Sequence, residues 1–183
     1  LPVFEDGILR EPTKTINSKN NNLIKDFQTN GDINGKLGQT RILPINQQTY
    51  KRIVLVGCGK FDKYSNTNYK KAITSALKKL SSTSHKNAIN LLASNGLIGK
   101  SDETYYRASR IMVESWYDIA YQYTATNSKK EKKYSLNKLY FGINGTKKNT
   151  SISKGLKHGQ SIGKAIQKVK YLGDLPANVC TPS

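Results

Sequence analysis

The sequence predicts an α/β fold of three layers, in which helices cover both faces of a mixed β-sheet. Strand-like and helix-like segments alternate along the 183 residues. The short, β-branched apolar run at 52–56 is typical of a strand that is buried on both faces. No internal repeat or linker is visible, so we expect an α/β domain over residues 1–150, a long connecting helix packed on it over 151–173, and a junction over 174–183.

The first third of the chain predicts mainly strands. Extended runs bounded by turn residues indicate strands at Leu1–Phe4, Gln39–Ile45 and Arg52–Val56. Between the first two of these strands, Leu23–Phe27 is a candidate for a short helix. Because the chain starts without methionine, we expect the first strand to be incomplete.

Apolar residues then recur at steps of three and four, which predicts an amphipathic helix. They are Tyr69, Ala72, Ile73, Ala76, Leu77 and Leu80. With the strands that flank it, at 52–56 and 88–93, this helix predicts a right-handed βαβ unit. The remaining expected elements are a helix at Asp102–Tyr123 capped by Ser101 or Asp102, a basic loop at Asn127–Lys133, a strand at Asn137–Ile143, a turn at Asn144-Gly145 and a helix at Ser151–Leu172.

The last predicted helix has a stripe without side chains. Gly155, Gly159 and Gly163 are spaced by four residues, so they share one face of the helix. Each glycine costs about 1 kcal/mol of helix stability relative to alanine. We therefore predict that this face lies close to another backbone. The apolar side chains expected on one side of the helix are Ile152, Leu156, Ile162, Ile166 and Val169.

The chain is strongly basic, with 30 Lys and Arg against 12 Asp and Glu and a net charge of +18. Such a charge favours polyanions by a salt-sensitive attraction, and lysine pairs interleaved with tyrosines are typical of some nucleic-acid-binding surfaces. Lysine and asparagine also have adenine-rich codons, so an AT-rich genome is an alternative source of the same bias. Both interpretations stay open at this point.

The composition favours a cytoplasmic protein. No apolar run is long enough to cross a bilayer, which needs about 20 residues, and the first residues do not resemble a secretory signal. The two cysteines, Cys58 and Cys180, make a poor disulfide framework and favour reduced thiols. We therefore expect no membrane partner.

The run Gly57-Cys58-Gly59-Lys60 follows a buried strand, as phosphate-binding loops do. It fits neither phosphate-binding pattern, because Phe61 stands where a P-loop needs Ser or Thr and Asp62 where a dinucleotide fingerprint needs glycine. We interpret the run as a tight exit from the strand.

No residue set predicts catalysis or metal binding. His85 and His158 have no ligand neighbours three or four positions away, and a Cys58–His158 nucleophile pair has no local support. Asp and Glu are scattered, and Asp102-Glu103 is interpreted as the start of a helix. The sequence therefore assigns no catalytic, metal-binding or cofactor-binding residue.

Three blocks of residues, in the same order, resemble the leucyl aminopeptidase (cytosol aminopeptidase) family. They are 31–40 (GDINGKLGQT), 52–60 (RIVLVGCGK) and 174–183 (DLPANVCTPS), and the last is the most specific. The resemblance implies an amino-terminal domain with an α/β/α fold similar to macro domains, which a long helix connects to a catalytic domain. In that family Asp174 and Cys180 are junction residues, outside the active site.

The resemblance also implies a function for the parent protein. Members remove amino-terminal residues from peptides with two divalent metal ions, zinc or manganese, held by Asp, Glu and Lys side chains of the catalytic domain. They assemble as hexamers, with the amino-terminal domains contributing to assembly, and some bacterial members bind DNA. The family's metal-binding segments have no counterpart in this sequence, so we expect this chain alone to be an inactive assembly or regulatory domain that lacks its catalytic domain.

Two other functions remain as alternatives. The charge of +18 favours a basic nucleic-acid-binding module. The similarity of the implied fold to macro domains favours a nucleotide-ligand binder, with Gly57–Lys60 as its expected site.

Overall fold

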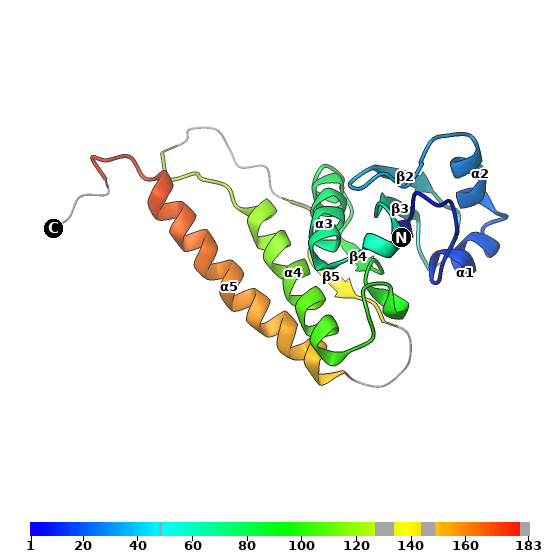
Figure 1. The fold of residues 1–183 in the computed structure, drawn as a ribbon. Coiled ribbons are helices and arrows are strands. Elements are labelled where there is room, and N and C mark those ends of the chain that lie inside the picture. The colour runs from blue at the N-terminus through cyan, green and yellow to red at the C-terminus, as the bar shows by residue number, and fades with distance from the viewer. Residues whose placement is uncertain (48, 127–133, 144–148, 180–183) are drawn as a thin grey trace.

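A computed structural model describes residues 1–47, 49–126, 134–143 and 149–179, and it confirms an α/β protein (Figure 1). The strands are β1 (Pro2–Val3), β2 (Thr40–Pro44), β3 (Arg52–Gly57), β4 (Asn87–Asn90) and β5 (Lys138–Phe141). The α-helices are α1 (Thr13–Ser18), α2 (Leu23–Thr29), α3 (Asn66–Ser81), α4 (Asp102–Ala120) and α5 (Thr150–Asp174). The predicted loop Asn127–Lys133, the turn Asn144-Gly145 and Cys180 lie outside the described residues.

The strands form two sheets. In the first sheet the order is β1-β3-β2, with β1 parallel and β2 antiparallel to β3, and in the second β4 pairs with β5 in parallel. The predicted βαβ unit is present as β3, α3 and β4, but its two strands do not pair with each other. The strands of the predicted mixed sheet are thus divided between two small sheets, and a groove lies between the edges of β3 and β4.

The helices form layers around these sheets (Figure 1). Helices α1 and α2 lie at one end of the molecule, where Ile24, Phe27 and Ile16 pack against residues of the first sheet. Helix α3 covers the opposite face of that sheet, and α4 packs beside α3. Helix α5 lies along α4 and is thus separated from both sheets by that helix.

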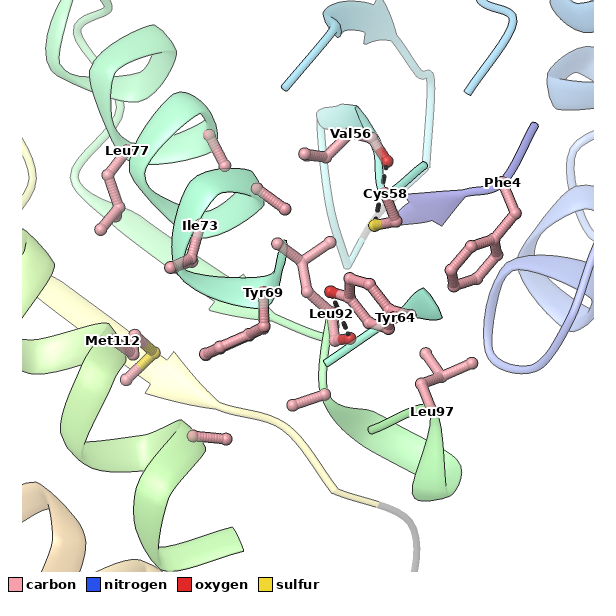
Figure 2. Close-up of a cluster of buried hydrophobic side chains, with 14 of the residues drawn as sticks. Phe4, Val56, Cys58, Tyr64, Tyr69, Ile73, Leu77, Leu92, Leu97 and Met112 are labelled. Atoms are coloured by element: carbon pink, nitrogen blue, oxygen red, sulfur yellow. Dashed lines mark hydrogen bonds between the residues drawn. The ribbon is translucent and has the colours of Figure 1, made fainter. Parts of the chain in front are cut away.

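The main core lies between α3, α4 and the strands, as Figure 2 shows. The side chains predicted for the inner face of α3 are buried, except that Leu80 is only partly so. Polar atoms in this core are paired: the Tyr64 hydroxyl donates to the Leu92 carbonyl at 3.1 Å, and the Asn90 amide donates to the Tyr69 hydroxyl at 2.8 Å. Such pairing offsets the cost of burying polar groups.

Helices α4 and α5 begin at side-chain caps. The Ser101 hydroxyl accepts the Thr104 N–H at 3.2 Å, which confirms Ser101 as a cap, and the Asn149 side chain accepts the Ile152 N–H at 3.0 Å. Among the helices that the structure describes, none is long and apolar enough to cross a membrane.

The glycine stripe of α5 faces α4, which confirms the predicted close approach. A Cβ atom on Gly155 would overlap the Tyr106 carbonyl oxygen, and one on Gly159 would lie 2.8 Å from the Arg110 carbonyl oxygen. We call this contact the glycine seam, and it consists of Gly155, Gly159 and Gly163 against α4.

Candidate functional site

The loop that follows β3 uses its N–H groups internally. The N–H groups of Gly57, Cys58 and Gly59 donate to the carbonyls of Gln39, Val3 and Gly35 at 2.7, 2.8 and 2.8 Å. A phosphate-binding loop needs N–H groups that point to the ligand. The geometry of Gly57–Lys60 therefore favours the predicted tight strand exit over a nucleotide site.

Glycines in the first two sequence blocks permit close backbone packing. A Cβ atom on Gly57 would overlap the Lys36 carbonyl oxygen, and one on Gly35 would overlap the Phe4 backbone. Gly35 also has a φ of +80°, which side chains rarely adopt. The blocks at 31–40 and 52–60 are thus held together backbone to backbone, and their glycines have a structural role.

A shallow hollow beside this loop carries the wrong charge for a phosphate. Glu5, Asp6 and Asp62 line it, together with Lys60. The guanidinium of Arg10 pairs with Asp6 at 2.6 Å, and its hydrogen bond lowers the pKa of Asp6. Arg10 also stacks on the Phe61 ring, 3.8 Å from the ring centroid. Its charge is therefore already engaged by protein groups.

The residues considered for nucleophilic chemistry lie apart. Cys58 is fully buried in the main core, where desolvation raises its pKa to about 11, so the thiol is inert. His158 is exposed on α5, with its Nδ1 3.0 Å from the Tyr106 hydroxyl. His85 lies at the groove between the sheets. The Cys58 thiol instead donates to the Val56 carbonyl at 3.5 Å, and among the described residues no hydrogen bond joins it to either histidine.

The described residues do not fit a two-metal centre. No group of three or more His, Cys, Asp or Glu side chains could hold a metal ion in this part of the chain. Four carboxylates instead pair with basic side chains, as Asp6–Arg10, Glu103–Arg107, Glu114–Arg110 and Asp118–Lys170. Asp102 and Glu103 lie in the first turn of α4, as predicted.

Helix α5 presents two further faces to solvent. The first, which we call the lysine face, has four exposed lysines at helical spacing: Lys154, Lys157, Lys164 and Lys168. The second, which we call the apolar stripe, consists of Ile162, Ile166 and Val169, which are 38%, 37% and 69% exposed. Leu172 and Tyr171 are also exposed near the end of the helix, at 57% and 43%. Sequence periodicity identified Ile162, Ile166 and Val169 but not their exposure. The first two members of the same predicted series do pack inward, since Ile152 is buried and Leu156 packs against the main core.

Comparison with known proteins identifies the family. The model of the "Cytosol aminopeptidase family, N-terminal domain" matches residues 1–130. A probable cytosol aminopeptidase of Buchnera aphidicola is 34% identical over 100% of this chain and 36% of its own length, and one of Psychromonas ingrahamii is 29% identical over 98% and 36%. The chain thus spans about a third of the length of these relatives.

Solved structures show the same fold. A mutant of tomato leucine aminopeptidase matches with a TM-score of 0.78 and 23% identity, over 98% of this chain and 35% of that one. The bottromycin maturation enzyme BotP matches with a TM-score of 0.65 and 15% identity, over 85% of this chain and 31% of that one. Because the family model matches more than half of the residues, the chain belongs to the cytosol aminopeptidase family and contains its N-terminal domain.

Proposed function

We propose that this chain is the non-catalytic, assembly or regulatory part of a cytoplasmic metallo-exopeptidase that removes amino-terminal residues from peptides. The observation that carries the proposal is the combination of family membership with carboxylates that are scattered and ion-paired in the described residues. Two divalent ions, zinc or manganese, would then be held by the rest of the parent, which accounts for about two thirds of the length of its relatives.

An aminopeptidase assay tests the proposal that this chain is non-catalytic. The purified chain is incubated with a leucyl-anilide and either Mn²⁺ or Zn²⁺, beside a blank that contains the metal alone. We expect equal rates in both, because the residues that the structure describes include no carboxylate cluster to activate water. Hydrolysis that exceeds the blank and is abolished by a chelator would contradict the proposal.

The apolar stripe is the surface by which we expect the chain to dock on its own catalytic domain. Ile162, Ile166 and Val169 are spaced by four and three residues, so they form a single row on α5. Complete burial of a Val or Ile side chain is worth about 1.5–3 kcal/mol. Since the row follows the second half of α5, a domain that follows this helix can cover it without another linker.

Docking is tested in the full-length parent, which we expect to be a hexamer. Val169→Gln changes the stripe, and the neighbouring Lys168→Gln changes the lysine face as the matched control. Val169→Gln should lower the parent's melting temperature or its hexamer fraction by light scattering, while Lys168→Gln leaves both near the wild-type values. Equal effects of the two substitutions would refute docking through the stripe.

Polyanion binding is a second candidate function, and the lysine face favours it. Its four lysines have no acidic residue beside them on α5 before Asp174. Each phosphate contact contributes about −0.9 to the slope of log K against log salt concentration, so four contacts predict a slope near −3.6. Replacing all four lysines by Gln should remove that part of the slope for duplex DNA. If the salt dependence of duplex DNA binding did not change in this variant, or if the chain did not bind DNA near physiological salt, polyanion binding would be ruled out as a function of the lysine face.

A further inference from the structure

Strand β2 forms an open edge of the first sheet. Among the described strands it pairs with β3 alone, because the sheet has the order β1-β3-β2. The Gly57 N–H donates to the Gln39 carbonyl at 2.7 Å, and the Ile45 N–H donates to the Lys51 carbonyl at 3.0 Å. The odd-numbered residues of β2 therefore turn their backbone groups toward β3, and the even-numbered residues turn theirs away from it.

The outward backbone groups of this edge have no backbone partner in the part of the chain that the structure describes. They are the N–H and C=O groups of Thr40 and Ile42 and the C=O group of Pro44. The Thr40 carbonyl accepts a hydrogen bond from the Arg41 side chain at 3.1 Å. Because proline has no N–H, Pro44 ends the row of donors, so the free edge is short.

The side chains of β2 divide between two faces of the sheet. Leu43 and Ile45 are buried among residues of α1 and α2. Since strand side chains alternate, Thr40 and Ile42 lie on the opposite face, which α3 covers. Both are only half-buried, so an added strand would cover surface that is still open.

Helix α3 brings positive charge to this face. Its Ser75 lies toward β2, since a Cβ atom on Gly38, two residues before that strand, would be 3.1 Å from the Ser75 hydroxyl oxygen. Lys71 and Lys79 are exposed and share this side of the helix, because each is four residues from Ser75. Arg41 is exposed on β2 itself, and neither β2, β3 nor α3 contains an acidic residue. The free edge is thus flanked by basic side chains.

We propose that the free edge of β2 binds an extended acidic peptide segment of a partner protein, which adds to the sheet as an antiparallel strand. The partner residue opposite Ile42 would exchange both N–H···O=C bonds with it, and its side chain would lie on the α3 face. Acidic side chains at alternate positions of the segment would then face Lys71 and Lys79. This inference goes beyond the proposed function and does not depend on it.

Charge and hydrogen-bonding groups favour this occupant over two others. A second copy of the chain would bring the same basic residues to the edge, and like charges oppose such pairing. The sugar-phosphate backbone of DNA offers acceptors but no donors, so it cannot match an edge that presents both. An antiparallel strand is favoured over a parallel one, because parallel pairing is slightly less stable per residue.

Peptides of equal charge test the backbone pairing. The probe is acetyl-Glu-Val-Glu-Val-Glu-amide, whose Glu residues would lie opposite Thr40, Ile42 and Pro44. One derivative carries an N-methyl group on every Glu nitrogen, and the other carries one on every Val nitrogen. Because the Glu N–H groups would face β2 and the Val N–H groups would face solvent, methylation of Glu should abolish binding and methylation of Val should preserve it.

Binding is followed by NMR of the whole chain. At saturation with the unmethylated probe, the amide hydrogens of Thr40 and Ile42 should exchange about tenfold more slowly than in the free chain, because exchange would require the added strand to leave. Light scattering of the chain without peptide measures whether it associates with itself.

Lysine substitutions test the charge. Lys71→Gln combined with Lys79→Gln should weaken binding of the probe about fivefold, as expected for the loss of two exposed ion pairs. The matched control is Lys70→Gln combined with Lys138→Gln, which removes the same charge. Lys70 shares the α4 side of the helix with Thr74, whose hydroxyl lies 3.5 Å from a hydroxyl of α4, and Lys138 belongs to the second sheet. This control should bind the probe as the wild type does.

Each contrary result overturns a definite part of the proposal. Equal binding of the two methylated peptides would overturn strand addition, since charge alone would then account for binding. Loss of binding on methylation of Val rather than Glu would overturn the antiparallel arrangement. Unchanged exchange at Thr40 and Ile42 would overturn the site itself. If self-association or duplex DNA slowed these two amides as much as the probe does, an acidic peptide would be overturned as the occupant.

Discussion

Replacing Gly155 with alanine should weaken the contact between α4 and α5, although alanine is the better helix former. The new Cβ would overlap the carbonyl oxygen of Tyr106 and the hydroxyl of Ser109, and would lie 3.2 Å from the Tyr106 carbonyl carbon. A serine side chain can rotate, but a helix backbone cannot yield locally. The two helices would therefore have to move apart along the glycine seam.

The expected magnitude follows from two opposing contributions. Alanine gains about 1 kcal/mol over glycine in a helix interior. Overpacking of a close contact costs typically 1–3 kcal/mol, and a clash with backbone belongs at the upper end of that range. We thus expect Gly155→Ala to lower the free energy of unfolding by about 2 kcal/mol. For Gly159→Ala, whose Cβ would lie 2.8 Å from the Arg110 carbonyl oxygen, we expect a smaller loss of about 1 kcal/mol.

Urea unfolding followed by circular dichroism measures the effect. The dependence of the free energy of unfolding on urea concentration should have the same slope in the variant and the wild type. Gly173→Ala is the matched control, because Gly173 lies in the same helix and a Cβ there would meet nothing within 4 Å. It should leave stability unchanged or raise it slightly. The double variant Gly155→Ala with Ser109→Ala should remain destabilised, because the Tyr106 carbonyl is still in place. If Gly155→Ala stabilised the chain as much as Gly173→Ala, the claim that the glycine seam has no room for a Cβ atom would be refuted.

Four further predictions concern other parts of the molecule. Burial lowers the pKa of the Leu1 amine from 8.0, its ordinary value, to about 6 in the folded chain. The free energy of unfolding should therefore be highest above pH 8 and fall by about 2–3 kcal/mol as the pH drops from 8 to 6, because only the unfolded chain binds the proton in that range. Acetylation of the amino terminus should abolish this pH dependence in chemical unfolding. Gly57→Ala should lower the free energy of unfolding by more than about 2 kcal/mol, because its Cβ would overlap backbone atoms, whereas Gly31→Ala should lower it by about 1 kcal/mol through its positive φ alone. Equal melting temperatures of the two variants would contradict this. Asn90→Ala leaves a core hydroxyl and an N–H without their partner and should cost about 2–4 kcal/mol in urea unfolding. Calorimetry with ADP-ribose should give no heat of binding, and saturable heat would restore the nucleotide-ligand alternative.

Features that depend on local spacing could be predicted from the sequence. The inner face of α3 follows directly from apolar residues at steps of three and four, and the cap at Ser101 from its place before an acidic first turn. The glycine spacing predicted a close backbone, because a helix face without side chains leaves room for a neighbouring main chain to approach. It did not identify α4 as the partner, since a periodic pattern describes one surface only.

Features that depend on distant parts of the chain could not be predicted. Helix α1 has no apolar period, and its buried residues Thr13 and Asn17 are stabilised by hydrogen bonds to Pro2 and to the segment 22–25. The division of the strands between two sheets is also non-local, because pairing depends on which edges meet in space. The local patterns of β3 and β4 are the same whichever strands they pair with.

The three faces of α5 can be separated by experiment, because each contacts a different environment. The glycine seam is already buried against α4, so substitutions there change the stability of this chain by itself. The apolar stripe is exposed, so Val169→Gln should leave the isolated chain nearly unchanged and act only in the full-length parent. Changes on the lysine face should alter salt-dependent binding and neither of the other properties. A substitution on the stripe that destabilised the isolated chain as much as Gly155→Ala would therefore show that the stripe supports the fold itself, and docking through it would lose its basis.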